Sequence, residues 1–135
     1  MTPSGDAAGT TVSISDLLEH ANGLAGAFAD ELRSMVDVDC GSYTPEGVNR
    51  IADAMARRFE DEGWSTERRI HKPSEGEPQL GDLLIGRMEG SNPAGRTVLL
   101  VGHMDTVFPE GTAAERPFTI RDGRAMGRPP HPWSA

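Results

Sequence analysis

The chain has 135 residues, enough for one small domain or part of one, and it carries 21 acidic side chains against 13 lysines and arginines. The formal net charge of −8 argues against a nucleic-acid partner and against an anionic membrane surface. No run approaches the ~20 consecutive apolar residues that a membrane-spanning helix needs. Residues 1–12 contain no lysine, no arginine and no apolar core of signal length, so we expect a cytoplasmic protein. The single cysteine, Cys40, has no internal disulfide partner, and we interpret it as a buried, inert thiol.

Two amphipathic helices are predicted after a disordered tail over 1–12. Ser13 and Asp16 form a capping-box pattern at the start of the first helix. Thr44 as N-cap and Pro45 at the first helical position begin the second helix, which ends at Gly63. Both helices carry apolar residues at helical spacing, which predicts that they pack side by side on a sheet. The predicted apolar stripes are Leu17, Leu18, Leu24, Phe28 and Leu32 in the first helix, and Ile51, Met55 and Phe59 in the second.

Three strands are predicted to follow, over 65–71, 82–88 and 97–101. The last is apolar or β-branched without a break, which is typical of an interior strand, so we expect Leu99 and Val101 to be buried. The turn between the second and third strands is too short for a helical crossover, which predicts that they are antiparallel neighbours. Two helices followed by a mixed sheet indicate an α/β fold.

A glycine, a histidine and an aspartate follow the predicted 97–101 strand, at Gly102, His103 and Asp105. Ligands of open α/β sheets bind in the crevice at the carboxyl ends of the strands, and both side chains can point into it. On spacing alone, such a histidine is more often a hydrogen-bonded structural residue than a metal ligand, because a zinc site needs several ligands.

Residues 98–109 resemble the first metal-site motif of the zinc-dependent aminoacylase and glutamate carboxypeptidase family of metallopeptidases. That motif is an apolar strand followed by Gly-His-x-Asp-Thr-Val, which this chain matches at His103, Asp105, Thr106 and Val107. The resemblance implies that His103 ligates one of two zinc ions. It also implies that Asp105 is a catalytic-site carboxylate that accepts a hydrogen bond from the other ring nitrogen of His103.

The resemblance covers 14–127, with a less specific match at 40–49 and a good match at 117–127, and implies the N-terminal part of a di-zinc exopeptidase-like catalytic domain. After Gly127 the family continues into a segment whose aspartate bridges the two zincs, whereas this chain continues into a Pro-rich octamer. We therefore expect 13–127 to be a partial, truncated catalytic domain and 128–135 to be an aberrant tail from a shifted reading frame or premature stop. His131, between prolines in that tail, is a poor substitute ligand.

The expected function is that of a zinc metallopeptidase or amidohydrolase that cleaves an amide next to a carboxylate, in a peptide or an N-acyl amino acid. Because the bridging aspartate and the catalytic glutamate are absent, we expect at most weak zinc binding and no activity from this chain alone. One alternative is a non-catalytic α/β module or a non-functional gene fragment, which associates through an exposed sheet edge. A nucleotide-binding domain is disfavoured because no Gly-x-Gly-x-x-Gly or P-loop spacing follows a strand.

Overall fold

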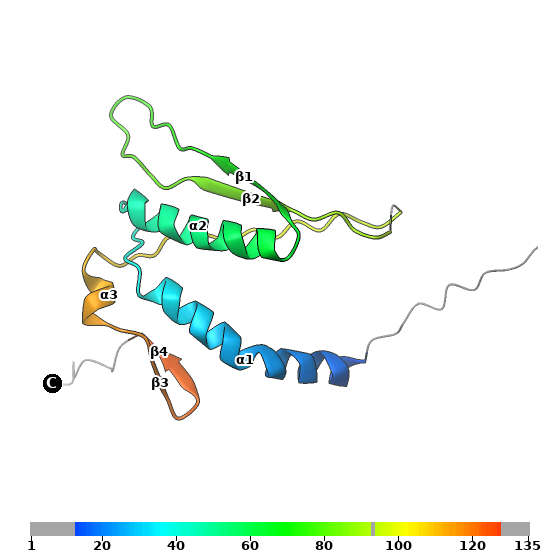
Figure 1. Ribbon diagram of the computed structural model, residues 1–135. Coiled ribbons are helices and arrows are strands. Elements are labelled where there is room, and N and C mark those ends of the chain that lie inside the picture. Colours follow the sequence, from blue (N-terminus) through cyan, green and yellow to red (C-terminus); the bar gives the residue numbers. More distant parts are fainter. Residues whose placement is uncertain (1–12, 93, 128–135) are drawn as a thin grey trace, which may run out of the picture. The chain divides into compact units, whose positions relative to one another are not determined.

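The computed structural model describes residues 13–92 and 94–127 (Figure 1). The predicted tail over 1–12 and the Pro-rich octamer over 128–135, His131 included, lie outside the described residues. The chain divides into two compact units, Met1–Leu32 and Arg33–Ala135. Within the described parts of the chain, no helix is long and apolar enough to cross a membrane.

The helix α1 (Ile14–Val36) forms the described part of the first unit, and its last turn belongs to the second. It begins with the predicted capping box: the Asp16 N–H donates to Ser13 Oγ at 3.1 Å, and the Ser13 N–H donates to Asp16 Oδ2 at 3.2 Å. In the predicted apolar stripe of α1, Leu17, Leu18, Leu24 and Phe28 are exposed, whereas Leu32 is half-buried. The predicted packing of this stripe on a sheet would join the first unit to the second, so it stays a prediction.

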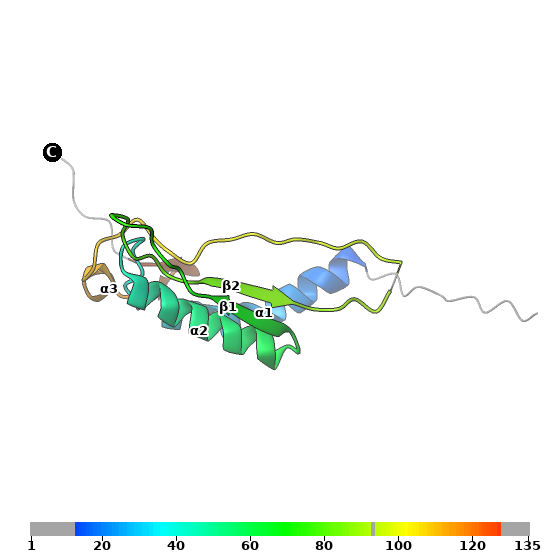
Figure 2. The ribbon, with the colours of Figure 1, turned by 90° about the horizontal axis from the view of Figure 1, so that it is seen from above.

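In the second unit, the helix α2 (Pro45–Asp61) packs on a hairpin of β1 (Ser65–Arg69) and β2 (Leu83–Arg87), as Figure 2 shows. The two strands are antiparallel, with Ser65 opposite Arg87. Ile51 and Ala52 on α2 are buried, but Phe59 is only half-buried. The Phe59 ring stacks on Trp64 with the ring centroids 5.1 Å apart.

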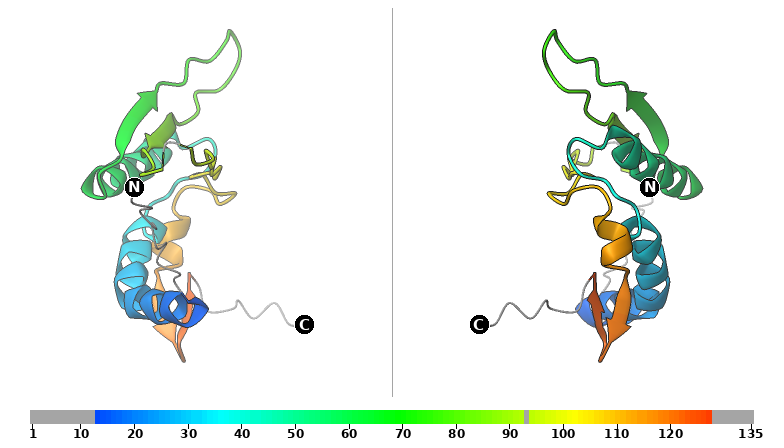
Figure 3. Two further views of the ribbon diagram at one scale, coloured as in Figure 1. Left: turned by 90° about the vertical axis from the view of Figure 1, so that its right-hand side faces the viewer. Right: turned by 90° about the vertical axis from the view of Figure 1, so that its left-hand side faces the viewer.

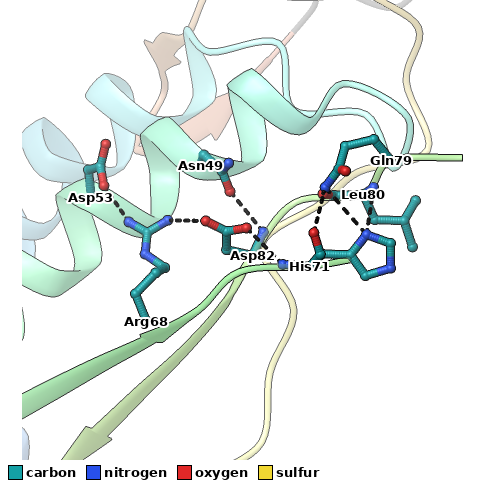
Figure 4. A network of polar contacts seen from close by, with 7 residues as sticks. All are labelled: Asn49, Asp53, Arg68, His71, Gln79, Leu80 and Asp82. Atoms are coloured by element: carbon teal, nitrogen blue, oxygen red, sulfur yellow. Dashed lines mark hydrogen bonds and ion pairs between the residues drawn. The ribbon is translucent and has the colours of Figure 1, made fainter. Parts of the chain in front are cut away.

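A polar network connects the long β1–β2 loop to the N-terminal half of α2 (Figure 4). Arg68 on β1 pairs with Asp53 on α2, and its guanidinium also lies 3.6 Å from the Asp82 carboxylate. Asp82 accepts the backbone N–H of His71 at 3.1 Å, while its own N–H donates to Asn49 Oδ1 at 2.8 Å. Both ends of the loop are thereby held on the same helix.

The predicted interior strand over 97–101 is wrong. These residues form no strand, and β2 has β1 as its antiparallel partner. Leu99 is 83% exposed and Val101 is 85% exposed, so the expectation that they are among the most buried residues is also wrong. The physical reason is that an apolar run is buried only where neighbouring strands and covering layers exist. Among the described residues, no strand pairs with 97–101.

The described part of the second unit ends with a short helix, α3 (Thr112–Glu115), and a hairpin of β3 (Thr119–Arg121) and β4 (Arg124–Met126), which are seen in Figure 3. The turn between these strands is formed by Asp122 and Gly123, with φ of 51° and 70°. Two successive positive φ values are those of the tight hairpin turn whose twist matches that of the flanking strands. The described residues thus combine helices with two small antiparallel sheets in place of the predicted mixed sheet, which is consistent with an α/β fragment.

Candidate functional site

The site begins with a backbone contact between the connector after α1 and the segment after 97–101. The Thr106 N–H donates to the Cys40 carbonyl at 2.8 Å, and the Ser42 N–H donates to the Thr106 carbonyl at 3.1 Å. A side chain at Gly41 would place its Cβ 2.6 Å from the carbonyl oxygen of Phe108. Glycine at position 41 therefore permits the two backbones to approach, and this approach brings Ser42 beside Asp105.

Asp105 links two side chains, those of Ser42 and His103. Its Oδ1 lies 3.1 Å from Nδ1 of His103, and the Asp105 carbonyl oxygen lies 2.9 Å from the same nitrogen. Both oxygens are acceptors, so this nitrogen carries the proton and Nε2 of a neutral ring has a free lone pair. The His103 side chain is 83% exposed, so Nε2 can be reached from outside. The expected hydrogen bond is present, whereas the metal-binding and catalytic roles stay predictions.

The Ser42 hydroxyl donates to Asp105 Oδ2 at 2.5 Å. This hydrogen bond first, and that from His103 second, lower the pKa of Asp105 below its ordinary value of 3.8. The carboxylate is therefore ionised at neutral pH and acts as an acceptor. The arrangement is not that of an activated nucleophile, because the Ser42 hydroxyl is bonded to the carboxylate and not to the imidazole that would take its proton.

Ser42 is the residue of this site that the sequence did not reveal. Its segment, 40–49, resembles the family only in general terms, and the pairing that aligns it with Thr106 joins residues 64 positions apart. No local spacing encodes such a contact.

The described residues provide a single candidate zinc ligand here. No group of three or more histidine, cysteine, aspartate or glutamate side chains that could hold a metal occurs within 13–92 and 94–127. Zinc sites in proteins use three or four ligands. Another histidine, His71, belongs to the polar network of the β1–β2 loop, where its Nδ1 accepts the Leu80 N–H at 3.1 Å (Figure 4). The described residues alone therefore do not form a zinc site, because the only ligand they supply here is the imidazole nitrogen of His103.

A pocket of about 590 Å³ lies next to these residues, within the second unit. His103 and Asp105 line it together with Cys40, Met104 and Arg116. Cys40 is buried, as predicted, and this burial raises the pKa of its thiol, which stays protonated at neutral pH. A protonated thiol is a poor nucleophile and metal ligand, in agreement with the interpretation of Cys40 as inert.

Comparison with known proteins gives one informative similarity. No protein-family model matches the chain. The chain is similar to a carboxypeptidase. It is 27% identical over 111 residues to Carboxypeptidase G2 of Pseudomonas sp. (strain RS-16), an alignment that covers 82% of this chain. The same alignment covers 25% of Carboxypeptidase G2, so this chain spans about a quarter of the length of that relative. This distant, partial similarity suggests a carboxypeptidase-like hydrolase.

Proposed function

We propose that this chain is the N-terminal part of a carboxypeptidase-like zinc hydrolase that cleaves an amide next to a carboxylate, in a peptide or an N-acyl amino acid. The observation that carries the proposal is the oriented ring of His103. The Asp105 carboxylate accepts a hydrogen bond from Nδ1 of His103 and another from the Ser42 hydroxyl. The imidazole is exposed, and its Nε2 is left free to bind a metal ion. The partial similarity to Carboxypeptidase G2 supports the reaction class.

In this proposal, Asp105 and Ser42 are positioning residues for the His103 imidazole. A histidine that ligates a metal must be neutral, and a carboxylate on its other nitrogen fixes the tautomer and raises the basicity of the ligating nitrogen. The remaining ligands have to come from outside the described residues. We therefore assign no catalytic step to these residues, and we expect the chain alone to be inactive.

The proposal is tested first by zinc titration of the purified chain in a calorimeter. We expect weak binding that disappears in His103→Ala and persists in His20→Ala, a control on the exposed face of α1. Asp105→Asn should weaken zinc binding by roughly 10–100-fold, as other changes to the partner of a ligating histidine do. Zinc binding that is unchanged in His103→Ala contradicts the proposal.

Hydrolysis is tested with N-acyl glutamate and dipeptides. The chain alone should show no turnover, with or without zinc. A fusion that appends the part of Carboxypeptidase G2 beyond its matched quarter should show turnover that His103→Ala abolishes and His20→Ala leaves intact. Turnover by the fusion that survives His103→Ala refutes the role of this histidine. Turnover by the unfused chain that His103→Ala abolishes would show that further ligands lie within its own sequence.

A further inference from the structure

The pocket beside His103 contains a cationic side chain that forms no ion pair with a described residue. Arg116, the residue that follows α3, lines this pocket, and its Nε is buried without a hydrogen-bond partner among the described residues. Its guanidinium lies over the Phe108 ring, 5.1 Å from the ring centroid. Buried donors in folded proteins are almost always bonded, so this nitrogen points to a missing acceptor.

The rest of the pocket is mainly apolar. Its walls include two thioether side chains, Met35 and Met104, and the buried or half-buried Val38, Cys40 and Ile51. The volume of about 590 Å³ falls in the ~300–1,000 Å³ range of small-molecule sites. Methionine side chains adapt to ligands of different shape. The pocket therefore suits a ligand with an apolar body.

Two carboxylates also line the pocket, but hydrogen-bond donors of the protein already engage them. Asp39 accepts the N–H groups of Gly111 and Ala113, both at 2.8 Å. Asp105 accepts the hydroxyl of Ser42 and the ring N–H of His103. Neither forms an ion pair with Arg116, which is the only lysine or arginine among the lining residues that the structure describes. An anionic group in this pocket would therefore lie at Arg116.

We propose that this pocket binds a monocarboxylate with an apolar body, its carboxylate on Arg116 and its apolar part against Met35 and Met104. A guanidinium presents a fork of N–H donors that matches the two oxygens of a carboxylate. The site requires neither zinc nor hydrolysis, so it goes beyond the proposed function and is tested without either.

The first experiment titrates the full chain with octanoate, below its micelle-forming concentration, and with 1-octanol, which has the same chain length but no charge. Calorimetry should show that octanoate binds about tenfold more tightly, since a charge-assisted hydrogen bond accounts for a difference of this order. In methyl NMR spectra, octanoate should shift the ε-methyl groups of Met35 and Met104. The ε-methyl of Met88, which is exposed and does not line the pocket, should not move. Octanoate that binds with the same affinity as the alcohol, or that shifts Met88 without shifting the two lining methionines, overturns the proposal.

The second experiment compares two matched variants. Arg116→Gln should weaken octanoate binding about tenfold. Arg124→Gln, on the exposed strand β4, should leave it unchanged. Unchanged binding in a folded Arg116→Gln variant, judged by circular dichroism, overturns the proposal. Should this variant fail to fold, the comparison of octanoate with octanol in the unaltered chain decides the question.

A third titration, with N-acetylleucine, distinguishes two classes of monocarboxylate that this pocket could bind. This compound carries its carboxylate next to an amide, as a peptide C-terminus does, whereas octanoate represents a free fatty acid. Binding of either compound through Arg116 supports the site, and the tighter of the two identifies the source. Binding of neither overturns the proposal.

Discussion

The Ser42 hydroxyl donates a 2.5 Å hydrogen bond to the carboxylate of Asp105, which lies 63 residues further along the chain. This contact exists because Thr106 exchanges backbone hydrogen bonds with Cys40 and Ser42. The carboxylate is thereby fixed on one oxygen and bonds the His103 ring through the other. The orientation of His103 thus depends on a connector between two helices.

Replacement of Ser42 by alanine should raise the pKa of Asp105 toward its ordinary value of 3.8, because the Ser42 hydroxyl is the main cause of the lowered pKa. The measurement is an NMR titration of the Asp105 carboxyl carbon. Ser65→Ala is the matched control, since the Ser65 hydroxyl donates to the Arg87 carbonyl, away from this site. An Asp105 pKa that is the same in Ser42→Ala and in the unaltered chain would show that the Ser42 hydroxyl does not lower it.

Asp39 should make the stability of the second unit depend on pH. The N–H groups of Ala113 first and Gly111 second lower the pKa of Asp39 below 3.8. Because the folded-state pKa is the lower one, the stabilisation is complete above the unfolded-state value and is lost as the pH falls through the folded-state value. Asp39→Asn should therefore be less stable than the unaltered chain at neutral pH, and the difference should shrink below pH 3.8. Urea unfolding across this pH range measures it, and a difference independent of pH would rule the explanation out.

Glycine-to-alanine substitutions in the two long helices should have opposite effects. At Gly47, in the first turn of α2, a Cβ would overlap the carbonyl oxygen of Asp39, whereas nothing lies within 4 Å of a Cβ at Gly26 in α1. Gly47→Ala must displace backbone and should cost at least ~1–3 kcal/mol. Gly26→Ala should stabilise α1 by ~0.5–1 kcal/mol, because alanine loses less conformational freedom in a helix. Urea unfolding followed by circular dichroism measures both effects. If Gly47→Ala leaves the free energy of unfolding unchanged, the connector that contains Asp39 moves to accommodate the Cβ.

The parts of the fold that follow from local signals were predicted correctly. The capping box at Ser13 and Asp16 starts α1, and Pro45 is the first residue of α2. The first two strands, β1 and β2, lie inside the predicted ranges. Each of these features depends on residues close in sequence, through a hydrogen bond, a fixed φ or a periodic apolar pattern.

Features that depend on distant neighbours were not predicted. Residues 97–101 have the composition of a buried strand, but burial requires flanking strands that the run itself does not specify. At the site, the resemblance around His103 and Asp105 implied their hydrogen bond, and both residues lie on one short segment. Ser42 and Arg116 reach the same region from elsewhere in the chain, and only the tertiary structure brings them there.

Replacement of Leu99 by lysine distinguishes the predicted buried strand from the observed exposed segment. The Leu99 side chain is 83% exposed, so Leu99→Lys should change the free energy of unfolding by no more than ~0.5 kcal/mol. Ile51→Lys, which places a charge in the buried core on α2, should unfold the second unit. Residues 97–101 also form an uncharged, β-prone run with no proline, which is the signature of an aggregating segment. Leu99→Lys should therefore raise the concentration at which the chain begins to aggregate, measured by light scattering. If Leu99→Lys destabilises the chain as strongly as Ile51→Lys does, the segment is buried in solution and the predicted strand is restored.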